Sequence, residues 1–265
     1  MNITGLLAGR GGSRKTTTAD AMHTWLNGHH GKYKPLLIDY DQQGNSSFTY
    51  GLDIDNLPTL YHVFNGDISI QEAIQHTPNG DIICGNASLN LIENQLTADN
   101  PQNITLLRDK LQELSKVYTH IIIDTPPKIQ GIIPTQVMAA ATSIVIPIIS
   151  DAYSIQGLTR ISKVAVPIKQ NYNPGLRFDG VLLTKYHGFI FHRSIKKVAE
   201  QWAAQNDSRV YKTTIRECVQ VQEAQGERQS LWEYAPRCTT ARSYHAFMKE
   251  YLERNPWAKK ILAPT

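Results

Sequence analysis

The chain has 265 residues and a mass of 29.8 kDa, and its 41% hydrophobic, 19% charged and 8% aromatic residues exclude disordered, collagen-like and disulfide-scaffold proteins. No apolar run approaches the roughly 18 residues that are needed to span a bilayer. The net charge of +4 is divided unevenly, with −2 over residues 1–175 and +6 over residues 176–265, which indicates either a polyanionic partner or solvated helix faces in the last third.

Short apolar runs alternate with helix-length stretches along the whole chain. The predicted strands, several of them continuous Ile, Leu and Val, are Ile3–Ala8, Pro35–Asp39, Asp81–Cys84, His120–Asp124, Ser143–Ile149, Asp179–Thr184 and Arg209–Thr213. The predicted helices are Lys15–Asn27, Pro101–Val117, Ile155–Gln170, Ser194–Gln205 and Thr240–Arg254. This alternation predicts a single α/β domain over residues 1–265, with a mostly parallel twisted sheet of about seven or eight strands and helices on both faces. Ligands of such sheets bind beyond the carboxyl ends of the strands.

The loop after the first predicted strand is rich in glycine and leads directly into a helix. Residues 9–18 read Gly-Arg-Gly-Gly-Ser-Arg-Lys-Thr-Thr-Thr. Small residues allow backbone N–H groups to surround a phosphate chain, and the start of a helix adds partial positive charge. As a P-loop, this segment would place Lys15 on the β- and γ-phosphates, Thr16 on Mg²⁺ and Thr17 on the α-phosphate. The predicted cradle consists of Gly11, Gly12, Ser13, Arg14, Lys15, Thr16 and Thr17.

Carboxylates follow two of the predicted buried strands. Asp39 and Asp41 lie two residues apart at a strand end, so both side chains project to the same side. Asp124 follows the run Ile121–Ile123 and precedes two prolines. A carboxylate in that position can hold Mg²⁺ near Thr16, partly through water. A turn or a helix cap is the alternative role for the first pair.

These motifs together resemble the ParA/Soj partition ATPases, which have a deviant Walker A motif and form one group with MinD. The resemblance extends over nearly the whole chain, and residues 36–45, 121–127, 147–158, 180–185 and 211–224 are similar to family segments. In the family motif K-G-G-x-G-K-T-T, Arg10 replaces the signature lysine, and Arg14 replaces a glycine. The family uses ATP, ADP and Mg²⁺.

The resemblance implies roles for individual residues. Asp39 would support the Mg²⁺ shell, and Asp41 would position the attacking water. Lys15 and Arg10 would neutralise the phosphates, with Arg10 reaching across an ATP-sandwich homodimer. Arg216 and Pro236 would lie near the adenine base. The family also binds double-stranded DNA nonspecifically and responds to a ParB-like centromere-binding adaptor, so a cytoplasmic, nucleoid-associated protein that segregates plasmid or chromosome DNA is expected.

Nonspecific DNA binding needs clustered cations and no base-reading motif. The candidates are Lys185, Arg193, Lys196, Lys197, Arg237 and Arg242. Because the P-loop begins at residue 9, no N-terminal helix-turn-helix extension is expected. MinD relatives reach membranes through a basic C-terminal helix, but the segment from Asn255 to Pro264 has only about seven residues between its prolines, so stable membrane association is not expected.

Arg14 leaves two functional hypotheses open. A bulky side chain at a glycine position restricts the backbone and occupies space over the phosphates. If the guanidinium fills the cradle, the chain is a ParA-like DNA-binding module with weakened or lost ATP turnover. Alternatively, Arg14 turns outward and makes a cross-dimer or DNA contact. The leading hypothesis remains an active, slow ATPase. A MinD-like membrane-associated regulator is the third, less favoured hypothesis.

Overall fold

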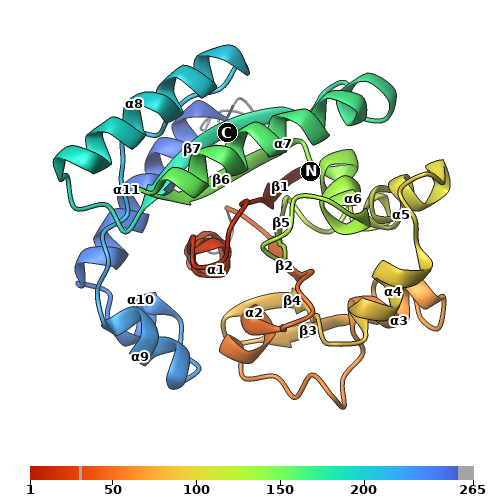
Figure 1. Ribbon diagram of the computed structural model, residues 1–265. Helices are drawn as coiled ribbons and strands as arrows, with labels where there is room; N and C mark the ends of the chain where they lie inside the picture. The colour runs from red at the N-terminus through yellow and green to blue at the C-terminus, as the bar shows by residue number, and fades with distance from the viewer. Residues whose placement is uncertain (30–31, 256–265) are drawn as a thin grey trace.

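The computed structural model describes residues 1–29 and 32–255, and the seven strands found among them form one sheet (Figure 1). The strands are β1 Asn2–Leu6, β2 Pro35–Asp39, β3 Ile74–Thr77, β4 Gly80–Ile83, β5 His120–Asp124, β6 Ser143–Ile149 and β7 Arg177–Thr184. Their order in the sheet is β3-β4-β2-β5-β1-β6-β7, and every pair is parallel except β3 with β4. The predicted α/β class and mostly parallel sheet are confirmed.

Helices cover both faces of the sheet, as predicted (Figure 1). The helices are α1 Lys15–Asn27, α2 Asn45–Thr49, α3 Leu60–Asn65, α4 Leu89–Gln95, α5 Pro101–Gln112, α6 Ile132–Ala140, α7 Ala152–Asn171, α8 Ile190–Gln205, α9 Gln220–Gly226, α10 Leu231–Tyr234 and α11 Thr239–Arg254. Buried residues of α5, α6, α7 and α8 form one hydrophobic core with the sheet, and those of α1, α10 and α11 form the other. Among the described residues, no helix combines the length and apolar character that crossing a membrane requires.

Successive side chains of the strands divide between these two cores. In β2, Leu36 and Ile38 belong to the core under α5–α8, while Leu37 belongs to the core under α1 and α11. Because side chains alternate along a strand, a strand buried on both faces is largely apolar at successive positions. This explains why the central strands are continuous apolar runs.

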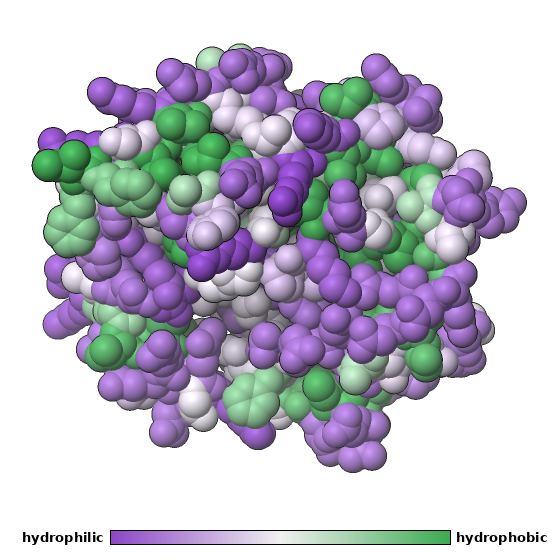
Figure 2. Space-filling model, viewed as in Figure 1, coloured by the Kyte–Doolittle hydropathy of each residue, from purple (hydrophilic) through white to green (hydrophobic). Residues whose placement is uncertain are grey.

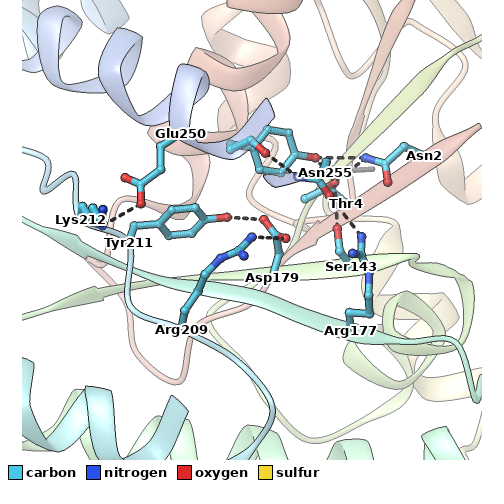
Figure 3. A network of polar contacts seen from close by, with 11 residues as sticks. Asn2, Thr4, Ser143, Arg177, Asp179, Arg209, Tyr211, Lys212, Glu250 and Asn255 are labelled. Atoms are coloured by element: carbon cyan, nitrogen blue, oxygen red, sulfur yellow. Dashed lines mark hydrogen bonds and ion pairs between the residues drawn. The ribbon is translucent and has the colours of Figure 1, made fainter. Parts of the chain in front are cut away.

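The predicted strand Arg209–Thr213 is wrong, although the segment does lie beside β7. It makes only an isolated parallel bridge, between Val210 and Val181. The backbone N–H groups of Lys212 and Thr213 donate instead to the Glu250 carboxylate of α11, each at 2.9 Å. Figure 3 shows the contact of Lys212 with Glu250. Because a side chain takes the donors that a ladder would use, the strand cannot continue.

Side chains hold this segment against β7. Both Tyr211 and Arg209 donate hydrogen bonds to the buried carboxylate of Asp179, the latter at 3.0 Å (Figure 3). Gly180 makes room for the ring, because a Cβ atom there would lie 2.6 Å from a ring carbon of Tyr211. The segment after α8 is therefore fixed by side chains beside β7, a strand that needs glycine at one position.

Other differences concern elements without a clear periodic pattern. The antiparallel strand β3 was not predicted, and its side chains are only partly buried. The helix α6 was not predicted either, because it is apolar on all sides and every one of its residues is buried. The remaining missed helices, α2, α3, α4, α9 and α10, have at most seven residues.

Candidate functional site

A cleft of about 280 Å³ lies at the carboxyl ends of the central strands, above the loop that joins β1 to α1. From this loop and the first turn of α1, all seven predicted cradle residues line it. From other segments it is lined by Asp41, Asn45, Pro127, Lys185 and Gln222. The structure therefore brings the glycine-rich loop together with Asp41, as the sequence predicted.

The loop is held in shape by its neighbours on β7 and α7. Gly9 packs directly against the backbone of α7, since a Cβ atom there would lie 2.5 Å from the Cα atom of Gly157. Gly12 has φ +75°, a conformation that side chains rarely adopt. The hydroxyl of Thr184, at the end of β7, donates to the Ser13 carbonyl at 3.1 Å. These constraints keep the loop curved around the cleft.

Ser13 supports a phosphate-binding role for the cleft. Its hydroxyl is buried and has no hydrogen-bond partner among the residues that the structure describes. A buried polar group without a partner is costly, so such groups in native proteins usually await a ligand or water. The donors of this loop thus fit an anion.

Lys15 is nearly buried at the start of α1 and lines the cleft. Burial lowers the pKa of its ammonium group, while the charges of Asp124 and Asp41 act in the opposite direction. Both carboxylates favour the cationic form. The Lys15 ammonium group therefore has little solvation of its own, which strengthens its attraction for a phosphate group.

Thr16 and Asp124, both predicted to hold Mg²⁺, lie in direct contact. The hydroxyl of Thr16 donates to Asp124 Oδ2 at 2.7 Å. Burial raises the pKa of Asp124, and the charge of Lys15 opposes that rise. A hydroxyl and a carboxylate are oxygen ligands of the kind that Mg²⁺ prefers, usually with several waters and substrate phosphates. Within the described residues there is no group of three or more His, Cys, Asp and Glu that could hold a metal ion.

Asp39 is placed behind the cleft. It is fully buried, and Ser47 donates to its Oδ2 atom from both backbone N–H and hydroxyl, each at 2.8 Å. Its Oδ1 atom accepts from the backbone N–H of Asp41 at 3.2 Å. With both oxygens bonded to protein, Asp39 is suited to support the metal shell and to orient Asp41. Sequence reasoning missed Ser47, because a serine in a short helix carries no distinctive pattern.

A fourth carboxylate, half-buried, lies next to the three predicted ones and was missed. Asp20, on α1, accepts a hydrogen bond from the Ser46 hydroxyl at 2.7 Å. The same hydroxyl is 3.5 Å from Asp124 Oδ2. Burial raises the pKa of Asp20 well above its usual range. The only available signal was its position one helical turn after Thr16, on the same face of α1.

Arg14 is the first departure from the P-loop pattern, and its geometry resolves where the side chain points. Its backbone lies in the left-handed region, with φ 65° and ψ 29°. Its guanidinium group pairs at 2.5 Å with Glu217, on the segment between α8 and α9. The side chain therefore points to a carboxylate at the rim, and the cradle is lined by the loop itself.

Arg10, the second departure, is turned away from its own cleft. It forms an ion pair with Asp151, which caps the start of α7, and its guanidinium carbon lies 5.3 Å from the ring centre of Tyr153. Its side chain is 46% exposed, and Arg10 is not among the residues that line the cleft. A role for Arg10 at the phosphates of this same chain would require it to leave Asp151.

The two residues predicted near the base lie outside the cleft. Arg216 is exposed and lines a small neighbouring cavity together with Arg14, Thr17 and Lys185. Its carbonyl accepts a hydrogen bond from the Thr240 hydroxyl at 2.6 Å. Pro236 is exposed between α10 and α11 and lines neither cavity. The structure thus brings Arg216 near the P-loop and leaves Pro236 apart.

Comparison with known proteins assigns the family. Residues 1–178 match the AAA domain family AAA_31. The chain is 30% identical over 251 residues to the chromosome partitioning protein ParA of Caulobacter vibrioides strain NA1000 / CB15N, covering 92% of this chain and 91% of that protein. The chain belongs to the ParA/Soj family. It is also 29% identical over 250 residues to the chromosome partitioning protein ParA of Myxococcus xanthus, covering 93% of this chain and 86% of that protein.

Solved structures agree with the fold of this ParA/Soj family member. Apo McdA from Cyanothece matches with a TM-score of 0.83 and 23% identity, covering 95% of this chain and 99% of that one. Cobyrinic acid a,c-diamide synthase from Mycobacterium smegmatis, with bound ADP and magnesium, matches with a TM-score of 0.79 and 23% identity. This match covers 94% of this chain and 93% of that one. At this identity the likeness concerns the fold alone.

In this ParA/Soj chain, the six cations predicted to bind DNA are divided between two layers. Arg193, Lys196 and Lys197 lie on α8, on the face of the sheet that α5–α7 also cover. Arg237 and Arg242 lie just before and within α11, on the opposite face. Lys185 lines the cleft and pairs with Glu217 at 3.1 Å. Their role in DNA binding stays a prediction.

The first turn of α8 carries an apolar group that sequence reasoning did not single out. Phe189, Ile190 and Phe191 are 64%, 80% and 55% exposed. Figure 2 shows green residues gathered at the upper left, where Figure 1 places the start of α8. The cations of α8 therefore follow directly on an apolar tip. The C-terminal tail considered for membrane contact, residues 256–265, lies outside the described residues.

Proposed function

We propose that this chain is a ParA-type ATPase that binds ATP with Mg²⁺ and forms a nucleotide-sandwich dimer. As a nucleoid-associated protein, it binds DNA nonspecifically and segregates plasmid or chromosome DNA. The observation that carries the proposal is the cleft lined by Lys15, Thr16 and Asp41, in which Thr16 is bonded to Asp124. The guanidinium group of Arg14, which also lines the cleft, is paired with Glu217. Membership of the ParA/Soj family supports the same function.

Each residue of the cleft has a distinct part in the proposed hydrolysis. The loop N–H groups and the start of α1 would bind the phosphates, and Lys15 would neutralise negative charge as it develops on the transferred group. Asp41, with its Oδ1 atom accepting the Gln43 N–H at 3.0 Å, would orient the attacking water. When bound through Thr16 and Asp124, Mg²⁺ would supply charge neutralisation on the phosphate oxygens. Because such catalysis depends on positioning, a slow enzyme that a ParB-like adaptor stimulates is expected.

Arg10 is the residue proposed to act across the dimer. Its exposed side chain lies beside α7 and outside its own cleft, so in a sandwich dimer it is free to exchange Asp151 for the phosphates of the partner chain. A guanidinium group binds phosphate with two parallel hydrogen bonds, which a lysine cannot do. This role requires two chains facing each other across the nucleotides.

Binding and turnover of the native protein test the proposal directly. Isothermal titration with ATP is expected to show saturable binding that needs Mg²⁺ for full affinity, and phosphate release is expected to be slow. Asp41→Ala is expected to bind ATP and to lose at least about 90% of phosphate release, since the water is no longer oriented. Asp55→Ala, which removes an exposed carboxylate remote from the cleft, is the matched control. Absence of binding by the native protein would favour the DNA-binding module without ATP turnover.

A further inference from the structure

Glu217 joins two cations on opposite sides of the cleft. Its Oε1 atom lies 2.5 Å from Arg14 Nη2 and 3.1 Å from Lys185 Nζ. Partial burial raises the pKa of Glu217, but the hydrogen bonds and charges of Lys185 and Arg14 outweigh this effect, so the pKa lies below its usual value. One carboxylate oxygen thus connects the start of α1 with the end of β7.

Both cations also have an uncommon backbone conformation. Among the described residues, four that are not glycine have a positive φ angle, and Arg14 and Lys185, with φ 65° and 50°, are two of them. A side chain in the left-handed region crowds its own backbone, which makes this conformation unfavourable for any residue with a Cβ atom. Such residues persist when surrounding contacts compensate for the strain. Here the two strained residues share a single partner.

The strained turn at Arg14 is part of the P-loop itself. The carbonyl of Arg14 accepts both the backbone N–H and the hydroxyl of Thr18, at 2.9 and 2.7 Å, and so begins α1. If residue 14 left the left-handed region, the chain would enter α1 in another direction, and the loop N–H groups would no longer converge. The family motif has glycine here, which adopts this region without strain.

Glu217 is itself firmly placed. On one side of it, Ile215 donates to the Leu183 carbonyl at 2.8 Å and its carbonyl accepts from Tyr186 at 3.1 Å. The adjacent carbonyl of Arg216 is held by the Thr240 hydroxyl of α11. The side chain of Arg14 is only 14% exposed, so its ion pair is less screened by water than a surface pair.

We propose that Glu217 is a positioning residue that holds Arg14, and with it the P-loop, in the phosphate-binding conformation that other family members obtain from glycine. This rests on the proposed nucleotide binding for its functional consequence. Among the cradle residues, Glu217 is paired with Arg14, and it does not itself line the cleft, so it acts on the phosphate site through Arg14. An arginine at position 14, where the family has glycine, then depends on the carboxylate at position 217 to hold the turn.

The test is a double-mutant comparison of Mg·ATP affinity in the native background and in the Arg14→Gly background. Glu217→Gln is expected to weaken binding about fivefold in the native background, because the competent loop conformation becomes less populated. In the Arg14→Gly background the same change is expected to leave affinity within about twofold, because glycine needs no partner to hold the turn. Glu223→Gln, an exposed carboxylate on α9 with the same charge change, is the matched control.

Other outcomes would overturn the proposal. If Glu217→Gln weakened Mg·ATP binding equally in both backgrounds, Glu217 would stabilise only the segment on which it lies and would not act through Arg14. Tighter binding in both would mean that its charge merely repels the phosphates, since removal of a carboxylate near the cleft favours anions.

Amide hydrogen exchange provides a readout without nucleotide. Peptides over residues 9–18 are expected to exchange faster after Glu217→Gln in the native background and at an unchanged rate in the Arg14→Gly background, because local opening increases only where the turn is strained. If the native protein fails to bind ATP but this pattern is found, the proposed function fails while the positioning role stands. An unchanged exchange rate in both backgrounds would overturn the positioning role.

Discussion

The two sides of the cleft are constructed in different ways. The phosphate side, residues 9–17, 39–45 and 124–127, consists of short segments that each leave a central strand, and its polar groups meet because parallel strands end at one edge. On the opposite side Lys185 lines the cleft and pairs with Glu217, which belongs to the segment of residues 209–217. This segment is held by side chains from distant parts of the chain, among them Asp179 and Glu250. The first side is therefore expected to determine ligand binding, and the second to depend on contacts that stabilise the fold.

The largest expected effect concerns the opposite side. Asp179→Ala is expected to lower the free energy of unfolding by about 3 kcal/mol, because it removes a carboxylate with a 2% exposed side chain and leaves Arg209 and Tyr211 without their shared acceptor. Urea denaturation followed by circular dichroism measures this loss. Glu253→Ala, an exposed change on α11, is the control and should alter stability by less than about 0.5 kcal/mol. Similar losses in both variants would mean that the Asp179 network does not hold this side.

The second largest expected effect concerns the phosphate side. Lys15→Ala is expected to weaken Mg·ATP binding about 100-fold, since hydrogen bonds to a charged group contribute roughly 1.5–3 kcal/mol and each 1.4 kcal/mol is tenfold in affinity. Isothermal titration measures the affinity. Unfolding in urea is expected to change little, because the variant removes a cation that burial disfavours. A large loss of stability with unchanged affinity would reverse the assignment of the two sides.

The same division explains what the sequence could and could not predict. Residues 9–17, Asp41 and Asp124 were found because each lies in a local motif next to a continuous apolar strand, and the structure places them together. Glu217 and Ser47 act through contacts with residues distant in sequence or through a short helix, and no periodic pattern marks them. The segment over residues 209–213 was interpreted as a strand from its composition, because the competing acceptor Glu250 is 37 or more residues away.

A third effect depends on pH and concerns α1, which both sides share. Burial lowers the pKa of His23 to about 4, next to the Tyr50 hydroxyl at 2.6 Å, although the charge of Asp81 acts in the opposite direction. The folded state favours the neutral form of His23. Its contribution to the free energy of unfolding is therefore complete above the pKa of the unfolded state, about 6.5, and is lost progressively as the pH falls from there through the pKa of the folded state. Between pH 7 and pH 5 this loss is about 2 kcal/mol.

Urea denaturation at several pH values measures that loss. His23→Gln is expected to be less stable at pH 7 and to show a smaller decline toward pH 5, because the titrating group has been removed. His187→Gln, an exposed histidine in the loop before α8, should keep the native pH dependence. An identical decline in the native protein and the His23 variant would assign the acid sensitivity to other groups.

The smallest expected effect concerns Ser47, behind the phosphate side. Ser47→Ala is expected to lower the free energy of unfolding by about 1.5 kcal/mol, because the hydroxyl that donates to Asp39 at 2.8 Å also accepts the Gly85 N–H at 3.2 Å. Thermal and urea unfolding measure the stability, with Ser194→Ala on the exposed face of α8 as the control. ATP affinity should fall by less than about threefold while phosphate release falls further, since Asp39 orients the backbone of Asp41 from behind the cleft. If affinity and turnover fell together, Ser47 would act on the phosphate cradle as a whole and Asp39 would have no separate part in placing Asp41.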